Sequence, residues 1–339
     1  MPANILKDVP LAPRTTLGVG GTAEYFAHVH SSEELEEVLM WARHDNVPVT
    51  ILGGGSNVLI FPQGIRGLVI HPDFKKVSYR TEDDCVLVTA GAGVILDELI
   101  EELVEKELWG LENLSAIPGT VGAVPIQNVG AYGVEAKDIV HAVTAYNMHS
   151  GETQVFTNVM CAFAYRDSLF KKHNKQYVIL DVTFCVSKQG NPILMYKDLQ
   201  NYFASSFAPT IRNVRSAVQA IRNKKFPDWR KIGTAGSFFK NPSITKEQYE
   251  VLRTMFPELP GHTNADGTIK LSLGWVLDKV CGLRGYSEGN VGLYTEQALV
   301  LVCTKNATGD EIKNFSEKII RSVHEKINVN VEYEVTFLA

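Results

Sequence analysis

The loop GGGSN at residues 53–57 constrains the fold most, because of the segments on either side of it. It follows the apolar run VPVTIL and leads into VLIF, which has the composition of a strand. Successive glycine N–H groups can form a nest for an anion, but Rossmann and P-loop folds pass the chain from such a loop into a helix. No GK[ST] follows here, and the later GAGVIL lacks the third glycine of GxGxxG. Both folds are therefore excluded. A plain turn between buried strands remains, or a loop along the diphosphate of an extended dinucleotide.

A second stretch of small residues favours the ligand-binding interpretation. Residues 114–135, LSAIPGTVGAVPIQNVGAYGVE, are mostly glycine, proline and small side chains. A turn needs few such residues, whereas a long bound ligand needs backbone donors and little bulk. The stretch also offers the side-chain amides of Gln127 and Asn128. Two such stretches among short strands resemble the FAD-binding domain of the vanillyl-alcohol-oxidase type.

Length and charge exclude several classes of protein. At 339 residues the chain exceeds the roughly 250 to 300 residues of one compact core, so two or three domains are expected. The net charge of −5 comes without a clustered basic face, which argues against nucleic acid as a partner. No segment reaches the roughly 18 apolar residues of a membrane-spanning helix, and the first residues lack a signal-peptide pattern. We therefore expect a cytoplasmic protein without membrane insertion.

The cysteines and histidines favour neither disulfides nor a metal. The five cysteines are scattered and form no CxxC pair, which predicts reduced thiols over disulfides or zinc. They are Cys85, Cys161, Cys185, Cys281 and Cys303. His28 and His30 would share one face of a strand, where a solvated pair is favoured over a metal site. No metal is predicted.

Helical and strand-like segments alternate irregularly along the chain. Apolar periodicity predicts helices at about 31–46, 95–108, 210–225, 245–255, 272–281 and 308–328. Ser31 or Ser32 can cap the first of these. The helix at 210–225 is basic and is expected to be exposed. Short strands fill the rest, which is typical of an α+β protein with no regular βαβ series, and the character of the chain changes near residue 205.

Seven stretches, in order, are similar to the UDP-N-acetylenolpyruvoylglucosamine reductase (UDP-N-acetylmuramate dehydrogenase) family. They are TTLGVGGTAEYF, ILGGGSNVL, GLENLSAIPGTVGAVPIQNVGAYGVE, AYRDSLFK, AGSFFKNP, EQALVLV and VEYEVTF. They span about residues 15–337, and the length of residues 256–290 favours the branch with a long closing loop. The resemblance implies an FAD-binding domain in two subdomains, 1–70 and 71–204. A C-terminal α+β substrate-binding domain, 205–339, would follow, with a closing strand at 329–337.

The resemblance also implies the residues of the site. The catalytic residues would be Arg166, Ser237 and Glu334. Substrate contacts would come from Tyr165, Tyr196, Lys225, Asn241, Arg284 and Gln297. Contacts to non-covalently bound FAD would come from Gly53, Gly54, Gly55, Ser56, Asn57, Ile117, Pro118, Gly119, Thr120, Gly122, Gln127, Asn128, Gly130, Tyr132 and Gly133.

The implied reaction is a reduction in peptidoglycan precursor synthesis. NADPH reduces FAD, which then gives hydride to the enolpyruvyl methylene carbon of UDP-N-acetylglucosamine enolpyruvate and yields UDP-N-acetylmuramate. Negative charge then develops at the neighbouring carbon and spreads into the substrate carboxylate, so the reaction needs cations and a proton donor. The protein is expected to act as a monomer.

Each catalytic assignment has a structural alternative in the sequence. The guanidinium of Arg166 can hold a carboxylate through two hydrogen bonds, or it can pair with Asp167. Glu334 shares one face of an alternating segment with Glu332, where two solvated carboxylates are the ordinary interpretation. Whether Glu334 would donate a proton, orient the enolate or position water stays open. Lys225 ends a basic helix that is normally a solvated face, although the substrate diphosphate gives such charges a partner.

Ser237 does not have the surroundings of a nucleophile. A serine nucleophile needs a strand-to-helix elbow of GxSxG type and a histidine base, and TAGSFFKNP provides neither. Its hydroxyl would instead give a proton to the substrate carbanion, which is itself the base. The glycine and alanine before it would admit the ligand, and Phe238 or Phe239 is expected in the core.

The sequence departs from the family at one position, and two alternative functions have to be considered. The closing loop of the long-loop branch carries a tyrosine over the nucleotide, but FPELPGHTNADG has none, and His262 is the nearest candidate. An oxidase of the same fold would often attach its flavin through histidine or cysteine, which the glycine stretches lack. A binding module without chemistry would not need Arg166, Ser237 and Glu334 together.

Overall fold

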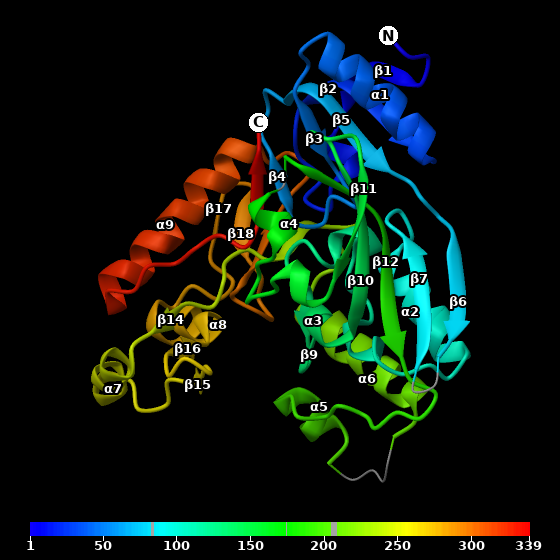
Figure 1. The fold of residues 1–339 in the computed structure, drawn as a ribbon. Helices are drawn as coiled ribbons and strands as arrows, with labels where there is room; N and C mark the ends of the chain where they lie inside the picture. The colour runs from blue at the N-terminus through cyan, green and yellow to red at the C-terminus, as the bar shows by residue number, and fades with distance from the viewer. Residues whose placement is uncertain (83–84, 174, 205–208) are drawn as a thin grey trace. The chain divides into compact units, whose positions relative to one another are not determined.

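The chain divides into two compact units. The computed structural model describes residues 1–82, 85–173, 175–204 and 209–339 (Figure 1). Unit 1 comprises Met1–Val9, Ala23–Gly55 and Arg66–Asn223, and unit 2 comprises Pro10–Thr22, Ser56–Ile65 and Lys224–Ala339. Two short segments from the N-terminal region thus belong with the C-terminal residues.

The boundary predicted after residue 204 adjoins residues 205–208, which lie outside the described residues. The helix that follows, α6 (Ile211–Lys225), belongs to unit 1 up to Asn223. The expectation that this basic helix is exposed is wrong, because Arg215 is buried together with an apolar face. The division of the flavin region at residue 70 and the assignment of a substrate domain stay predictions.

The first sheet of unit 1 is covered by helix α1 (Ser32–His44). Its strands lie in the order β1 (Ile5–Pro10), β2 (Thr22–Val29), β5 (Ile65–Pro72) and β3 (Val49–Ile51). The hydroxyl of Ser31 accepts a 3.2 Å hydrogen bond from the N–H of Glu34, which starts the helix as the sequence predicts. Leu35, Val38, Leu39 and Ala42 then pack on the sheet.

A second, five-stranded sheet of unit 1 carries helix α2 (Leu96–Glu105). The strand order is β11 (Thr153–Thr157), β10 (Val140–Asn147), β12 (Tyr177–Val186), β7 (Val86–Gly91) and β6 (Val77–Thr81) (Figure 1). Leu96, Leu99, Ile100, Leu103 and Val104 form the apolar stripe of α2 and pack against this sheet. Shorter elements complete the unit: β8 (Gly130–Ala131), β9 (Val134–Glu135), α3 (Ala136–Ile139), α4 (Leu169–Lys172) and α5 (Lys197–Tyr202).

Unit 2 is built on a four-stranded antiparallel sheet. Its strand order is β13 (Gly233–Ser237), β19 (Val300–Cys303), β18 (Val291–Leu293) and β17 (Ser287–Glu288). A smaller sheet has the order β14 (Ser243–Ile244), β16 (Ile269–Leu271) and β15 (Gly261–Thr263). The helices are α7 (Lys246–Met255), α8 (Leu273–Trp275), which continues as a π-helical turn over Val276–Val280, and α9 (Gly309–Ile327). Thr308 and Glu311 form a capping box at the start of α9.

The C-terminal segment is less regular than the predicted strand at 329–337. Only β20 (Thr336–Leu338) is a strand, and it pairs in parallel with β4 (Val58–Ile60). Val329, Val331 and Val335 are nonetheless buried in alternation with more exposed residues, as the pattern predicts. The backbone bends at Glu334 because the segment pairs with different partners before and after it.

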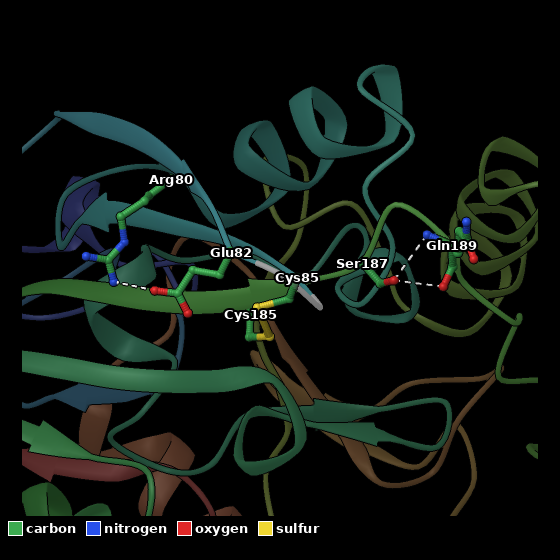
Figure 2. The surroundings of a disulfide bond; sticks show 6 residues. All are labelled: Arg80, Glu82, Cys85, Cys185, Ser187 and Gln189. Atoms are coloured by element: carbon green, nitrogen blue, oxygen red, sulfur yellow. Dashed lines mark hydrogen bonds and ion pairs between the residues drawn. A yellow bond between two sulfur atoms is a disulfide. The ribbon is translucent and has the colours of Figure 1, made fainter.

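The expectation that all cysteines are reduced is wrong, because Cys85 and Cys185 form a disulfide with a Cα–Cα distance of 5.8 Å (Figure 2). The antiparallel pairing of β7 with β12 brings together two residues that are 100 positions apart. Spacing along the sequence cannot reveal such a pair. Cys161, Cys281 and Cys303 are free.

The helices of the described residues include none with the length and apolar character needed to cross a membrane.

Candidate active site

The two glycine-rich segments of unit 1 lie backbone against backbone. A Cβ built on Gly54 would lie only 2.8 Å from the Cα of Gly119, and one built on Gly53 would lie 3.1 Å from the Oγ1 of Thr120. Gly119 has a φ of +125°, which side chains rarely allow. The loop runs from strand β3 into strand β4, as the sequence predicts. Glycine is therefore required here so that the two predicted cofactor segments can approach each other.

Segment 117–122 is fixed from one side by the turn that follows β7. The N–H of Leu96 donates to the carbonyl of Gly119 at 3.1 Å, and the N–H of Val121 donates to the carbonyl of Val94 at 2.8 Å. A Cβ on Gly122 would lie 2.7 Å from the Cβ of Ala92. These contacts, made by backbone groups and the small side chain of Ala92, fix the backbone of the segment.

Several backbone donors of these segments have no acceptor within the part of the chain that the structure describes. They are the N–H groups of Gly53, Gly54, Gly55, Gly119 and Thr120. Most buried or half-buried N–H groups in proteins are paired, and consecutive unpaired ones form an anion-binding nest. The donor set therefore fits the diphosphate of a dinucleotide such as FAD.

The later part of the predicted FAD segment has a structural role. The side-chain amide of Asn128 donates to Glu135 and to the carbonyl of Ala164, both at 3.0 Å, and its oxygen accepts from the N–H of Lys137 at 2.9 Å. Asn128 is fully buried and joins three segments. Gln127 is half-buried at the start of this part of the segment.

Gly130, Tyr132 and Gly133 belong to a tight hairpin between β8 and β9. Tyr132 and Gly133 both have positive φ, +50° and +90°, as a two-residue hairpin loop requires. Burial raises the pKa of Tyr132 to about 12, and the nearby Arg222 opposes this shift. The phenol is therefore a neutral hydrogen-bonding group at physiological pH.

Arg166 lies at the tip of a second tight turn of unit 1. Ala164 and Asp167 exchange backbone hydrogen bonds of 3.0 and 3.2 Å, and Arg166 between them has a φ of +53°. A non-glycine residue in this region costs free energy, and such residues cluster at functional sites. Its Nη2 donates to the carbonyl of Gly130 at 3.2 Å. Asp167, the alternative partner considered for Arg166, forms an ion pair with Lys172 at 3.1 Å.

Two tyrosines predicted to contact substrate pack beside these turns. The Arg166 guanidinium carbon lies 5.3 Å from the ring centre of Tyr165, a cation–π arrangement. Tyr196 meets Tyr132 edge-to-face at 5.2 Å and is partly exposed at the start of α5. Both rings can present a hydroxyl while their bodies are packed.

In unit 2, Ser237 ends strand β13 opposite Val300. It is half-buried, and no hydrogen-bond partner of its hydroxyl occurs among the described residues. Gly236, with a φ of +73°, precedes it, and no helix follows directly. Phe238 and Phe239 are fully buried, as the sequence predicts. The serine is thus on a strand and away from any strand-to-helix elbow.

Glu334 is tied to the residue after Ser237 and to the glycine loop. Its N–H donates to the carbonyl of Phe238 at 3.0 Å, and its carbonyl accepts from the Nδ2 of Asn57 at 3.1 Å. Glu332, the other acid of the predicted pair, is exposed and forms a 2.9 Å ion pair with Lys240. The structure therefore separates the two carboxylates, since Glu334 is half-buried among predicted site residues.

The remaining predicted substrate residues of unit 2 lie in different surroundings. Asn241 Oδ1 accepts from the N–H of Leu273 at 3.0 Å, which joins the β13 segment to α8. Gln297 packs against Gly274, where a Cβ would lie 2.6 Å from its Oε1. Arg284 is exposed and pairs with Asp278 at 3.5 Å. Lys225 is the half-buried last residue of α6.

The closing loop contains the smaller sheet of unit 2. His262 lies exposed in β15, opposite Lys270 of β16. Its role as a substitute for the family tyrosine stays a prediction.

Sequence reasoning missed three charged residues next to the predicted cofactor segment, two of which contact Ala116, the residue just before it. Asp97 accepts a hydrogen bond from the N–H of Ala116, Arg222 donates to the carbonyl of Ala116, and Arg215 pairs with Asp97. Arg215 and Arg222 carried a signal, the basic run of α6, but it was interpreted as a solvated face. Asp97 resembled an ordinary acid in the first turn of a helix.

Two family models match the chain, one in its N-terminal half and one in its C-terminal part. Residues 23–157 match the FAD binding domain, and residues 227–338 match the C-terminal domain of UDP-N-acetylenolpyruvoylglucosamine reductase. A solved structure of the reductase from Thermus caldophilus superposes with a TM-score of 0.68 at 24% sequence identity, covering 99% of this chain and 98% of that one. The predicted fold class, an FAD-binding domain of the vanillyl-alcohol-oxidase type followed by a C-terminal α+β domain, is confirmed.

Curated relatives cover nearly the whole chain. A UDP-N-acetylenolpyruvoylglucosamine reductase from Ralstonia nicotianae is 41% identical over 332 residues, which are 96% of each protein. Proteins of the same name from Neisseria gonorrhoeae and Porphyromonas gingivalis are 39% and 35% identical, and cover 97% and 99% of this chain and 96% and 99% of their own. The resemblance found in the seven sequence stretches is thereby confirmed. The chain belongs to the UDP-N-acetylenolpyruvoylglucosamine reductase family of FAD-dependent oxidoreductases.

Proposed function

We propose that this chain catalyses the NADPH-dependent reduction of UDP-N-acetylglucosamine enolpyruvate to UDP-N-acetylmuramate in peptidoglycan precursor synthesis. When bound, FAD supplies the hydride that adds to the enolpyruvyl methylene carbon, after NADPH has reduced it. The protein itself must hold the flavin, orient the substrate, stabilise the developing carboxylate charge and deliver one proton.

We assign the FAD diphosphate to the unpaired N–H groups of the two glycine-rich segments. Five donors at Gly53–Gly55 and Gly119–Thr120 support this assignment, because an anion would satisfy backbone groups that have no partner among the described residues. The same segments carry no histidine or cysteine. The flavin is accordingly expected to be non-covalent.

The proposed role of Arg166 is to bind the substrate carboxylate as negative charge spreads into it. A guanidinium is permanently charged and can form two parallel hydrogen bonds with a carboxylate. Its left-handed backbone and its hydrogen bond to Gly130 support a fixed orientation beside the FAD segment. A fixed cation needs no reorganisation as the charge develops.

The proposed role of Ser237 is to give its hydroxyl proton to the carbon next to the carboxylate. A positioned general acid typically contributes about 10² to 10⁴-fold to the rate. The hydroxyl has no acceptor in the described part of the chain, so its proton is not committed to another protein group. Glu334 is proposed to complete the stabilisation of the enolate together with Arg166.

The observation that carries the proposal is the junction of Glu334, Phe238 and Asn57. Two hydrogen bonds, of 3.0 and 3.1 Å, join the predicted carboxylate to the strand of Ser237 and to the predicted FAD loop. In the proposed enzyme the link fixes the proton donor and the carboxylate to the loop that holds the cofactor.

The test follows the flavin colour under anaerobic conditions. Purified protein should be yellow, NADPH should bleach it, and UDP-N-acetylglucosamine enolpyruvate should restore the colour without oxygen. Bleaching by NADPH without restoration by the sugar would contradict the proposed substrate. Colour that persists under NADPH would point to an oxidase, and protein that stays colourless after incubation with FAD would contradict both flavoenzyme functions.

A further inference from the structure

Ala116, the residue just before the predicted FAD segment, has a strained backbone. Its φ is +59°, a left-handed conformation that costs a non-glycine residue roughly 1–2 kcal/mol. The next residues, Ile117–Gly122, are those predicted to contact FAD. The direction in which this segment leaves Ala116 therefore depends on whatever keeps Ala116 in this conformation.

Two charged side chains hold the peptide groups of Ala116. Its N–H donates to Oδ1 of Asp97 at 2.6 Å, and its carbonyl accepts from Nε of Arg222 at 3.2 Å. Asp97 lies in the first turn of α2, and Arg222 lies near the end of α6. One side chain from each helix thus forms a hydrogen bond with Ala116. Charge-assisted hydrogen bonds of this kind are stronger than neutral ones.

Asp97 is itself oriented by Arg215. Nη1 and Nη2 of Arg215 contact Oδ1 and Oδ2 of Asp97 at 2.6 and 3.2 Å, which is a bidentate pair. The Arg215 side chain is only 8% exposed, and that of Asp97 is 32% exposed. Burying a guanidinium requires an ionised partner, so the buried Arg215 depends on the carboxylate of Asp97 and holds it in one orientation.

Helix α6 also reaches the far end of the cofactor region. Arg222 lies two helical turns after Arg215 and therefore on the same face, and it interacts with the phenol of Tyr132 in the β8–β9 hairpin. Burial lowers the pKa of Arg222, while Tyr132 and Asp97 favour its charged form. One face of α6 thus contacts Ala116 and Tyr132, which lie on either side of Ile117–Gly122.

We propose that the Asp97–Arg215 ion pair is a positioning device for FAD, which holds Ala116 in its left-handed conformation and so sets the path of Ile117–Gly122. The inference rests on the proposed contacts between that segment and FAD. A pair that only fastened α6 to α2 would stabilise the unit without this effect. The distinction lies in the hydrogen bond to Ala116, because an ordinary helix-to-helix ion pair has no contact with the cofactor segment.

The experiment measures the FAD dissociation constant, the visible flavin spectrum and the melting temperature of the holoenzyme. Asp97→Asn keeps the shape and removes the charge, and Arg215→Lys keeps the charge and removes the two-pronged geometry. We expect each to raise the FAD dissociation constant about tenfold or more, the scale of a lost charge-assisted hydrogen bond, and to shift the flavin bands. Glu101→Gln is the matched control. Glu101 lies 3.9 Å from Arg215 and is 63% exposed, and among the described residues the acceptor for the Ala116 N–H is Asp97, so the FAD dissociation constant should change less than about twofold.

A rescue variant separates positioning from stability. Glycine adopts positive φ without the cost that alanine carries, so Ala116→Gly in the Asp97→Asn background should recover at least part of the FAD affinity. If the wild type binds FAD, and Asp97→Asn and Arg215→Lys bind it as tightly as the wild type does, the inference is overturned. A loss of melting temperature alone, or a loss of affinity that Ala116→Gly does not restore, would also overturn it. If Asp97→Asn does not fold, the same comparison is made with Arg215→Lys, alone and combined with Ala116→Gly. Wild-type protein that does not bind FAD would instead contradict the proposed function.

Discussion

The N–H of Glu334 donates a 3.0 Å hydrogen bond to the carbonyl of Phe238, the residue directly after Ser237. A displacement of either segment therefore moves both side chains that we propose to act on the substrate. Asn57 holds the carbonyl of Glu334 at the same place. This arrangement explains how residues from the middle and the end of the chain can serve one reaction, and it makes the following predictions specific.

Ser237→Ala should separate the two half-reactions. Bleaching of the flavin by NADPH should stay near the wild-type rate, because no proton goes to the substrate in that step. Restoration of the colour by the sugar substrate should slow by about 10² to 10⁴-fold, measured by anaerobic stopped-flow absorbance. Ser287→Ala, at an exposed serine of the same sheet, is the control. Equal losses in both halves would assign Ser237 to flavin geometry.

Arg166→Lys should impair the second half-reaction more than the first. Lysine keeps the charge but cannot form two parallel hydrogen bonds with a carboxylate, and loss of one donor to a developing anion costs about 10² to 10³-fold. Single-turnover reoxidation by the sugar substrate measures the effect. The exposed Arg80, which pairs with Glu82, provides the control Arg80→Lys. Wild-type reoxidation in Arg166→Lys would show that charge alone suffices.

Gly54→Ala should weaken FAD binding more than Gly53→Ala does. The new methyl at residue 54 would meet the backbone of Gly119 at 2.8 Å, whereas at residue 53 it would meet the hydroxyl of Thr120 at 3.1 Å, which can move. We expect Gly54→Ala to lower the affinity about tenfold or more, or 1.4 kcal/mol, as measured by flavin fluorescence titration. The reverse order would show that the two segments do not form one cofactor surface.

Reduction of the Cys85–Cys185 disulfide should destabilise the protein. It closes a loop of 100 positions, and disulfides typically contribute about 2–4 kcal/mol to the free energy of unfolding. Dithiothreitol should lower that free energy in the wild type and leave a Cys85→Ser, Cys185→Ser variant unaffected. Alkylation of unreduced, denatured protein should label the three free thiols, Cys161, Cys281 and Cys303. Five labelled thiols would contradict the disulfide.

The protein should lose stability at alkaline pH through its buried thiols. Burial raises the pKa of Cys161 and of Cys303 from 9.0 to about 12. Between these values the unfolded chain releases protons that the folded protein keeps, so the free energy of unfolding falls as pH rises, by up to about 1.4 kcal/mol per pH unit for each thiol. Urea unfolding at pH 8 and pH 10.5 measures the slope. Cys303→Val should reduce it, and an unchanged slope would show that Cys303 does not contribute.

Local patterns in the sequence were sufficient for much of the fold. Periodicity predicted α1 and α9 to within about two residues, and the capping serine predicted the start of α1, because these signals act between neighbours in the chain. The exclusion of Rossmann and P-loop folds rested on the strand that follows the glycine loop, which the structure confirms.

Only the tertiary structure shows which residues far apart in the sequence pair with each other. Cys85 and Cys185 looked like isolated thiols until β7 paired with β12. The basic helix α6 looked exposed, but the burial of Arg215 depends on Asp97 of another helix. A charge is stable inside a protein only beside its counter-charge, and the sequence of one helix does not contain that information.

The sequence by itself thus determined the local elements, the glycine-rich segments and, through the family motifs, the class of cofactor. Only the tertiary structure decided that Glu334 and Asn57 join the strand of Ser237, and that Glu332 pairs with Lys240. The physical reason is that alternation places both glutamates on one face, while hydrogen bonds and burial from distant segments determine which of the two lies in the candidate site.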